Sequence, residues 1–450
     1  MTTSADHSLL STRTERRVLL AALLVGAALR LWAIFAYQSP LISDDKDYDA
    51  IARAVVHGDG YSFEGKPTAY RLPGYPLLLA GSYALFGERY GPVKALQLIF
   101  DELSCLLLFA IGKRLFSPKV GLVAAWVLAL FPIQILYVTH LMTETIFTAM
   151  LLLIVWLAVR DPRGEGGLST DIAIGVSVGV AVLFRSPVGL FPLVIFLYRW
   201  KLGVRSDRLV RSAGVIFLAM FVVLSPWLVR NYEVFHRWTV TSNGGVNFWI
   251  GNHEHASGSY SFPSVDNPLA VVDDDFERSD LGVKLAFAFI LAHPGEEGAI
   301  VAKKFAHFFA ADYWLMMTME FRPEWAHPAH AVTVFRQLSL LHAVVLHLPY
   351  IAVLLLGTFA VVCCPGTDRN TFFLFGGTFL YWLFIHLIYF ADARYRFPIV
   401  SLLILSAAYG WFMVRERTFV ASRPRILIFS LLVLLFVAGW VGEIVILARG

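Results

Sequence analysis

Long apolar segments alternate with short polar connections along almost the whole chain. Most are near the roughly 18 to 22 residues that a helix needs to cross a hydrocarbon core of about 30 Å. We expect spans near 18–37, 94–115, 120–138, 141–159, 171–184, 187–199, 211–229, 342–362, 371–390, 397–413 and 424–446. The fifth and sixth are short and separated only by Arg185-Ser186-Pro187, which is compatible with one broken or tilted element. The pattern predicts an all-α polytopic membrane protein of about eleven transmembrane helices.

Basic side chains gather in alternate connections between these spans. They are Arg13, Arg16 and Arg17, then Lys113, Arg114 and Lys119, then Arg160 and Arg163, then Arg199, Lys201, Arg205, Arg208 and Arg211, and finally Arg415, Arg417, Arg423 and Arg425. With eleven spans every group falls on one side, which the positive-inside rule makes cytoplasmic. The first span carries no small-residue cleavage site, so we expect it to be uncleaved, with a cytoplasmic N-terminus.

Composition supports the membrane assignment. Hydrophobic residues make up 58% of the chain and the mean hydropathy is +0.66, whereas soluble domains are roughly half apolar. The net charge of +4 is small and lies mostly on the cytoplasmic side, so it does not indicate nucleic-acid binding. Cys105, Cys363 and Cys364 form no disulfide framework, and packed or free thiols are expected.

Two long connections lie on the outer face under this topology. Residues 38–93 form the first outer loop and residues 230–341 the second, within a single transmembrane domain of residues 1–450. Loops of this length are usually functional or disordered. Residues 44–57 are expected to form an interfacial amphipathic helix, with Tyr48 on its apolar face. Residues 277–313 are expected to form two helices broken at His293-Pro294-Gly295.

Four acids in six residues follow the first predicted span. Asp44 and Asp45 come directly after Ser43, an acceptable N-cap, so they could simply complement the positive end of a helix. Capping does not need four acids, however, and an exposed helix end can present a general base to a substrate. We take Asp44 as the base and Asp45 as its alternative, and expect Asp47 and Asp49 to be solvated.

Glu144 lies in the outer end of the predicted span 141–159, where an acid is a functional candidate by default. His140 precedes it with i,i+4 spacing, which would place both side chains on one helical face. The alternative is a polar pair satisfied within the bundle. One His and one Glu do not complete a metal site.

Arginines on the outer side depart from the positive-inside pattern. Arg71 lies in the first outer loop, where the prolines and glycine of residues 73–76 predict a tight, irregular backbone. Arg394 and Arg396 lie at the outer mouth before the span 397–413. A phosphate group would account for them, because Arg forks match phosphate oxygens, although pairing with Asp392 or a loop acid is the alternative.

Two further features carry weaker signals. Arg185 could reach a cavity or snorkel outward. The run 243–260 mixes aromatic and amide residues that suit a sugar, but such clusters are also ordinary turn chemistry. The spacing of its two histidines, His253 and His255, is a poor zinc pattern without further ligands.

Several segments, taken together and in order, form a recognisable set. They are residues 43–55, 71–81, 142–145, 225–235, 250–258 and 393–399. The set resembles bacterial C-type (GT-C) glycosyltransferases, in particular the dolichyl-phosphate-mannose protein mannosyltransferase family (family 39) and the related lipid A aminoarabinose transferase. The resemblance extends over about residues 18 to 400.

The resemblance implies a GT-C bundle in the bacterial inner membrane that takes a sugar from a polyprenyl-phosphate carrier on the extracytoplasmic face. Carried over by position, it makes Asp44 the catalytic base with Asp45 beside it, Glu144 the second acid, Arg71 the ligand of the lipid phosphate, and Arg394, Tyr395 and Arg396 the phosphate end of the donor site. We also expect Arg185 to bind phosphate and Tyr48, Tyr70, His140, Tyr395 and Asn252 to line the substrate.

The sequence departs from the family in two ways. The aminoarabinose transferase has Asp-Glu where this chain has Asp44-Asp45, and the soluble carbohydrate-binding domain common in the family is not evident here. Acceptor recognition, whether of a glycan, a lipid or a protein, would then fall to the outer loops. Whether Mg²⁺ or Mn²⁺ assists the reaction stays open, because acids could hold either ion to the phosphate.

The competing interpretation is a transporter or lipid-linked sugar flippase, because intramembrane acids and arginines also line transport paths. Such folds usually show internal repeats with paired broken helices, and none is evident in this sequence. A pocket joining Asp44, Glu144 and Arg71 at the outer face would favour sugar transfer, whereas a charged path to the cytoplasmic loops would favour transport.

Overall fold

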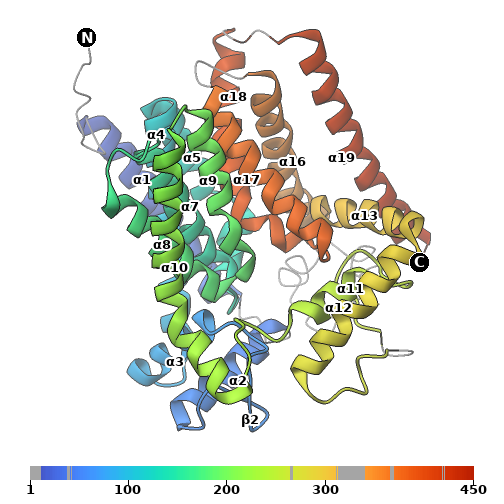
Figure 1. Ribbon diagram of the computed structural model, residues 1–450. Helices are drawn as coiled ribbons and strands as arrows, with labels where there is room; N and C mark the ends of the chain where they lie inside the picture. The colour runs from blue at the N-terminus through green and yellow to red at the C-terminus, as the bar shows by residue number, and fades with distance from the viewer. Residues whose placement is uncertain are drawn as a thin grey trace.

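The computed structural model describes residues 12–37, 41, 43–263, 267–310, 312, 340–364, 369–417, 419 and 421–449. Within these residues the chain is a bundle of helices with one two-stranded hairpin (Figure 1). The last part of the predicted second outer loop, residues 313–339, lies outside the described residues.

Each predicted span corresponds to one helix or to a broken helix. They are α1 (Arg13–Ala36), α4 (Tyr90–Leu115), α5 (Pro118–Ala129) with α6 (Pro132–Tyr137), α7 (Glu144–Arg160), α8 (Leu168–Phe184), α9 (Pro192–Lys201), α10 (Ser206–Phe235), α16 (Leu340–Cys363), α17 (Arg369–Ile388), α18 (Phe397–Arg415) and α19 (Arg423–Arg449). The all-α membrane fold is therefore confirmed. The count of eleven spans is not, because only six helices of the described chain are long and apolar enough to cross a membrane alone.

The shorter helices end where proline begins a new one. Proline fits the first turn of a helix but cannot continue one, because it lacks an N–H and clashes with the preceding turn. Pro132 accordingly starts α6 three residues after α5 ends, and Pro192 starts α9 after a 3-10 turn over Ser186–Leu190. The predicted break at residues 185–187 is confirmed.

Two helices of the predicted second loop meet at a sharp angle. The helix α12 (Asp275–Ala292) is followed by its C-cap residue His293, and α13 (Pro294–Phe309) begins at the next residue. The two are bent by 111° and together are apolar enough to count as one broken span or a re-entrant loop. The predicted pair of helices broken at His293-Pro294-Gly295 is confirmed, although residue 313 itself is not described.

Small residues bring the principal helix pairs close together. The helix α4 packs on α5 where Gly112 faces Gly121, and a Cβ added to Gly112 would lie 2.7 Å from the Cα of Gly121. The helix α8 packs on α10 through Gly175, whose Cβ would lie 2.4 Å from the carbonyl oxygen of Ile216. Close backbone approach of this kind is typical of membrane helices, whose association depends on packing rather than on exclusion of water.

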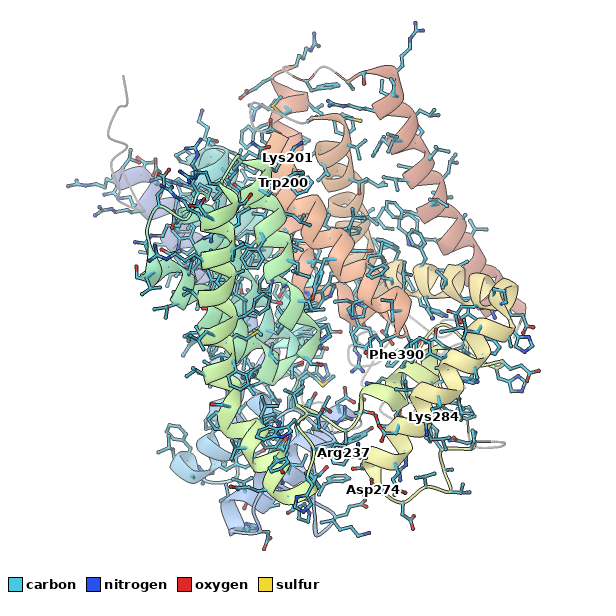
Figure 2. The ribbon with its side chains drawn as sticks, viewed as in Figure 1. Trp200, Lys201, Arg237, Asp274, Lys284 and Phe390 are labelled. Carbon is cyan, nitrogen blue, oxygen red and sulfur yellow. The ribbon has the colours of Figure 1, made fainter. Side chains whose placement is uncertain are left out.

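The outer-loop elements and the basic connections lie at opposite ends of the bundle. The helices α2 (Asp44–His57) and α3 (Gly74–Phe86) lie at one end with the hairpin of β1 (Ser62–Phe63) and β2 (Lys66–Pro67), opposite the α18–α19 connection (Figure 1). Figure 2 shows Lys201, from a basic connection, at the far end from Arg237 and Asp274. This arrangement agrees with the predicted division between basic connections and outer loops.

The first outer loop folds against the bundle. As predicted, α2 is amphipathic: Tyr48, Ile51 and Ala52 are buried on one face. The tight backbone expected over residues 73–76 is confined to the residues before Gly74, because Gly74 already starts α3. A Cβ at Gly74 would lie 2.5 Å from Phe184, so this glycine allows α3 to approach the end of α8.

A buried ion cluster lies inside the bundle, away from both outer loops. Arg30 of α1 binds Asp101 of α4, and both side chains have 0% exposure. Its guanidinium also donates to the carbonyl oxygens of Ala129 (2.8 Å) and Leu128 (3.3 Å). Arg30 thereby joins α1 to α4 and donates to the last carbonyl group of α5, that of Ala129, while the Leu128 carbonyl oxygen also accepts the Phe131 N–H.

Candidate active site

Asp44 lies where three distant parts of the chain meet. It is the first residue of α2, and both of its carboxylate oxygens accept hydrogen bonds from arginine. Arg71 Nη2 donates to Oδ1 at 2.8 Å, and Arg394 Nη1 donates to Oδ2 at 3.0 Å. Arg394 belongs to the short turn between α17 and α18, so the structure brings together three of the predicted site residues.

These contacts set the protonation of Asp44. Burial acts to raise the pKa of the carboxyl group, but the charges of Arg394, Arg71 and then Arg185 outweigh it and hold the pKa well below its ordinary value. Asp44 is therefore ionised at neutral pH. Its ion pairs stabilise the fold above the ordinary carboxyl pKa of about 4, and this contribution is lost as the pH falls toward the lowered pKa of the folded state.

Asp47 belongs to the same cluster, contrary to the sequence-based expectation that it is solvated. Arg71 donates to Asp47 Oδ2 through Nε (2.9 Å) and Nη2 (2.6 Å). The guanidinium of Arg71 also lies 4.7 Å from the ring centre of Tyr70 and 5.6 Å from that of Tyr48. The spacing between Asp44 and Asp47 is i,i+3, so the sequence contained a signal that both point the same way.

The capping role that the sequence left open applies to Asp45. Its Oδ1 accepts the backbone N–H groups of Ser43 (2.7 Å) and Lys46 (3.0 Å), and the side chain is buried. The Ser43 side chain makes no cap hydrogen bond of its own. Asp45 therefore closes the start of α2, while Asp44 faces the arginines.

The expectation that Asp49 is solvated is wrong. Its carboxylate accepts the Tyr83 hydroxyl at 2.6 Å and Arg53 Nε at 2.8 Å, and the residue is buried between α2 and α3. Asp49 lies five positions after Asp44 and joins the two outer helices. Its role is structural.

Glu144 and Arg185 form the second ion pair of the site. Glu144 starts α7 with 0% side-chain exposure, and its Oε1 lies 2.5 Å from Arg185 Nη2. Arg185 also donates from Nε to Thr143 Oγ1 at 2.9 Å. Its guanidinium lies 5.8 Å from the ring centre of Tyr395, whose hydroxyl accepts from Arg394 Nη2 at 3.2 Å. Arg185 therefore turns inward and connects Glu144 to the Asp44 cluster through Tyr395.

We expect Glu144→Leu to destabilise the protein by about 2–4 kcal/mol, since removing one partner of a buried ion pair leaves the other charge uncompensated. Equilibrium unfolding in mixed detergent micelles measures this loss. The matched control is Glu88→Leu, whose partner Arg53 is one-third exposed, so it should cost at most about 1 kcal/mol. Equal losses in the two variants would contradict the buried role of Glu144.

His140 is placed differently from the prediction. The helix α7 begins at Glu144, so His140 precedes the helix and the expected i,i+4 face does not exist. The His140 carbonyl oxygen instead accepts from Gln97 Nε2 at 2.8 Å, and Gln97 also accepts from the hydroxyl of Tyr75 at 2.6 Å. Turns and bends between residues 138 and 143 lead into α7, where Arg185 contacts both Thr143 and Glu144.

Two other predicted site residues contact the scaffold. Arg396 Nη1 donates to the Phe308 carbonyl oxygen at 2.7 Å, and its guanidinium lies 4.0 Å from the ring centre of Tyr350. Asn252 accepts from Lys304 Nζ at 2.7 Å and donates to the Ile388 carbonyl oxygen at 2.9 Å. The structure does not bring these two side chains into contact with the Asp44 cluster; they join α13 to the segments that carry Arg394.

Metal ligation was left open by the sequence. Among the residues that the structure describes, no group of three or more His, Cys, Asp or Glu side chains could hold a metal ion. The acids of the cluster are matched with arginines instead: Asp44 and Asp47 with Arg71, and Glu144 with Arg185. The described donor set therefore does not fit a carboxylate-bound divalent cation.

The chain is similar to known proteins in part of its sequence and in its fold. Residues 66–229 match the family model of dolichyl-phosphate-mannose-protein mannosyltransferase. A comparison with curated proteins finds no match. The solved oligosaccharyltransferase AglB from Archaeoglobus fulgidus, in complex with an inhibitory peptide and a dolichol-phosphate, is similar with a TM-score of 0.52 and 14% identity over 95% of this chain and 55% of that one.

A second solved protein is ArnT from Cupriavidus metallidurans bound to undecaprenyl phosphate, with a TM-score of 0.41 and 13% identity over 88% of this chain and 77% of that chain. The present chain spans about half the length of the archaeal oligosaccharyltransferase. Together with the family match, the likeness to AglB confirms the GT-C fold that the sequence motifs predict.

Proposed function

We propose that this chain is a GT-C glycosyltransferase that transfers a sugar from a polyprenyl-phosphate donor to an acceptor hydroxyl. The reaction takes place on the extracytoplasmic face of a bacterial inner membrane and inverts the anomeric centre. The observation that carries the proposal is the Asp44 carboxylate, held on both oxygens by arginines from two distant segments. A candidate base and candidate phosphate ligands are thus in direct contact at the end of the bundle that carries α2.

In the proposed reaction the donor phosphate takes over the guanidinium groups of Arg71 and Arg394, whose forks match phosphate oxygens. Asp44 then loses the hydrogen bonds that suppress its proton affinity. Its free carboxylate accepts the proton of the acceptor hydroxyl, and a base in direct contact with that proton is what general base catalysis requires. Donor binding would therefore precede activation of the acceptor.

The bond changes follow from this arrangement. The acceptor oxygen attacks the anomeric carbon from the face opposite the phosphate, while the bond between that carbon and the phosphate oxygen breaks. The polyprenyl phosphate leaves with the electron pair, and nearby arginines stabilise the charge that develops on it. A single displacement without a covalent intermediate gives inversion.

The remaining site residues supply the surroundings of this reaction. Glu144 fixes Arg185, which adds a third positive charge beside Tyr395. Tyr48 and Tyr70 place their rings against the Arg71 guanidinium and help to hold it beside Asp44. Arg396 and Asn252 would hold the Arg394 turn, because Arg396 donates to a carbonyl oxygen of α13 and Asn252 to one of α17.

A transporter or flippase is the second candidate. It would require charged groups that are accessible along a path through the bundle. The Arg30–Asp101 pair has 0% side-chain exposure, and Arg199, paired with Asp171 at 2.7 Å, is also buried. Buried ion pairs of this kind join helices and are not accessible to a transported solute. The charges of the described residues therefore favour sugar transfer over transport.

We expect Arg71→Ala to weaken the binding of undecaprenyl phosphate by about 10- to 100-fold, since a charged hydrogen-bonding partner of the phosphate is lost. Native mass spectrometry of the detergent-purified protein with added undecaprenyl phosphate measures the affinity. The control is Arg89→Ala, which removes an exposed arginine of the same outer loop. An unchanged affinity in Arg71→Ala would move the phosphate role to another residue.

The transfer itself is tested by comparing the envelope glycans of a deletion strain with those of the parent. Loss of one sugar modification is the expected result, and complementation with the wild-type chain should restore it. A glycan profile that is unaltered, together with a purified protein that binds no undecaprenyl phosphate, would contradict the proposed function.

A further inference from the structure

The backbone that carries Arg71 is held by hydrogen bonds at four consecutive carbonyl groups. The donors are Arg230 Nη1 to Thr68 (2.8 Å), the Ser242 N–H to Ala69 (3.0 Å), Thr241 Oγ1 to Tyr70 (3.1 Å) and the Tyr61 hydroxyl to Arg71 (2.9 Å). Loop carbonyl groups usually face water and leave the backbone mobile. This segment instead has its carbonyls satisfied by protein groups, which fixes its conformation.

Arg230 is the residue that connects these contacts. It lies near the end of α10 and donates to the carbonyl oxygens of both Thr68 and Tyr61, from Nη1 at 2.8 Å and from Nη2 at 2.9 Å. Its guanidinium lies 4.9 Å from the ring centre of Trp227 and 5.6 Å from that of Tyr61. The ring centre of Phe235 lies 5.0 Å away as well. A planar fork between two carbonyl groups and three aromatic rings is a geometry that lysine cannot reproduce.

The contact with Tyr61 leads directly to Arg71. Arg230 binds the Tyr61 backbone and lies over its ring, and the Tyr61 hydroxyl donates to the Arg71 carbonyl oxygen. Neighbouring Asn231 adds to this support. Its Nδ2 donates to the Thr239 carbonyl oxygen at 2.7 Å, and Thr241 and Ser242, which follow, donate to the carbonyl oxygens of Tyr70 and Ala69. The segment 225–235, to which the resemblance gave no role, thus contains the residues that hold the backbone of Arg71.

We infer that Arg230 is a positioning residue that fixes the backbone of residues 68–71 so that the Arg71 guanidinium faces Asp44 and the donor phosphate. The inference rests on the proposed function and extends it to a residue outside the ion cluster. A residue that only stabilised the fold would affect donor binding whether or not Arg71 were present. A residue that acts through Arg71 would lose its effect once Arg71 is removed.

A double-mutant cycle on undecaprenyl phosphate binding separates these two roles. Arg230→Lys keeps the charge but removes the fork, and we expect it to weaken binding by about 3- to 30-fold in the wild-type background. In the Arg71→Ala background the same substitution should change the affinity less than about twofold. The control is Arg237→Lys, which alters an exposed arginine of the same region that pairs with Asp280.

Tyr61→Phe gives a second, milder test, because it removes only the hydroxyl that binds the Arg71 carbonyl oxygen and keeps the ring beneath Arg230. It should also weaken the binding of undecaprenyl phosphate, again only when Arg71 is present. If Arg230→Lys does not fold, Tyr61→Phe replaces it in the double-mutant cycle. Losses that simply add to those of Arg71→Ala, or an affinity equal to wild type, overturn the assignment of Arg230. A wild-type protein that binds no undecaprenyl phosphate overturns the proposed function instead.

Discussion

We expect Asp44→Asn to lower the rate of sugar transfer by about 10²- to 10⁴-fold, the usual contribution of a general base. Asparagine has nearly the shape of aspartate, and its amide oxygen can still accept a hydrogen bond from Arg71 or Arg394. It cannot take the proton of the acceptor hydroxyl. Single-turnover transfer with the sugar donor identified from the deletion strain measures the chemical step directly, free of donor binding and product release.

The adjacent carboxylate provides a matched control. Asp45→Asn removes a charge one residue away, but Asp45 accepts hydrogen bonds from the start of its own helix. Asparagine keeps a side-chain oxygen that accepts these bonds and caps a helix about as well as aspartate, so we expect the stability to stay nearly unchanged and the transfer rate to stay within about tenfold of wild type. A transfer rate in Asp44→Asn within about tenfold of wild type would remove Asp44 as the base.

The largest effect on stability is expected for Arg30→Met, at about 3–5 kcal/mol. The substitution leaves Asp101 fully buried without its countercharge, which is the costly way to break a buried ion pair. It also removes the donors to the Ala129 and Leu128 carbonyl oxygens at the end of α5. Equilibrium unfolding in mixed detergent micelles measures the change in the free energy of unfolding.

A compensating variant separates charge from packing. Replacing a buried pair by apolar side chains is often neutral, so Arg30→Met combined with Asp101→Leu should recover part of the loss. Recovery should be incomplete, because the Ala129 carbonyl oxygen loses the Arg30 donor and Glu102, 3.7 Å from Arg30 Nη1, loses its countercharge. A double variant less stable than Arg30→Met would show that Asp101 has a partner beyond this cluster.

The helices were the most predictable part of this chain. Apolar runs set their positions closely, since a helix in a membrane must satisfy its own backbone and bury an apolar surface. Averaged hydropathy did not reveal the buried ion cluster. Each of its charged residues lies within a predicted span, where a charged side chain already indicates a partner; they are Arg30, Asp101 and Glu102. The exact number of membrane crossings did not follow, because helices such as α5 are too short for a simple length rule.

Part of the cluster of acids and arginines could be predicted from the sequence, but its pairings could not. Asp44, Arg71 and Arg394 were expected near a common substrate, and both arginines contact Asp44. The choice of Asp44 over Asp392 as the partner of Arg394 depends on contacts across 350 residues, which no local pattern encodes. Local spacing also misplaced His140, because the start of α7 at Glu144 is decided by the turn before it.

The ion cluster also bears on how the reaction cycle would end. Arg71, Arg394 and Arg185 are matched by Asp44, Asp47 and Glu144 before any ligand arrives. A sugar-linked polyprenyl phosphate is a diester with a single negative charge, whereas the spent carrier is a monoester that gains a second negative charge above about pH 6. The same arginines would hold the spent carrier more tightly than the fresh one. Under the proposed function, release of the spent carrier would then limit turnover, and the spent carrier would act as a product inhibitor of the enzyme.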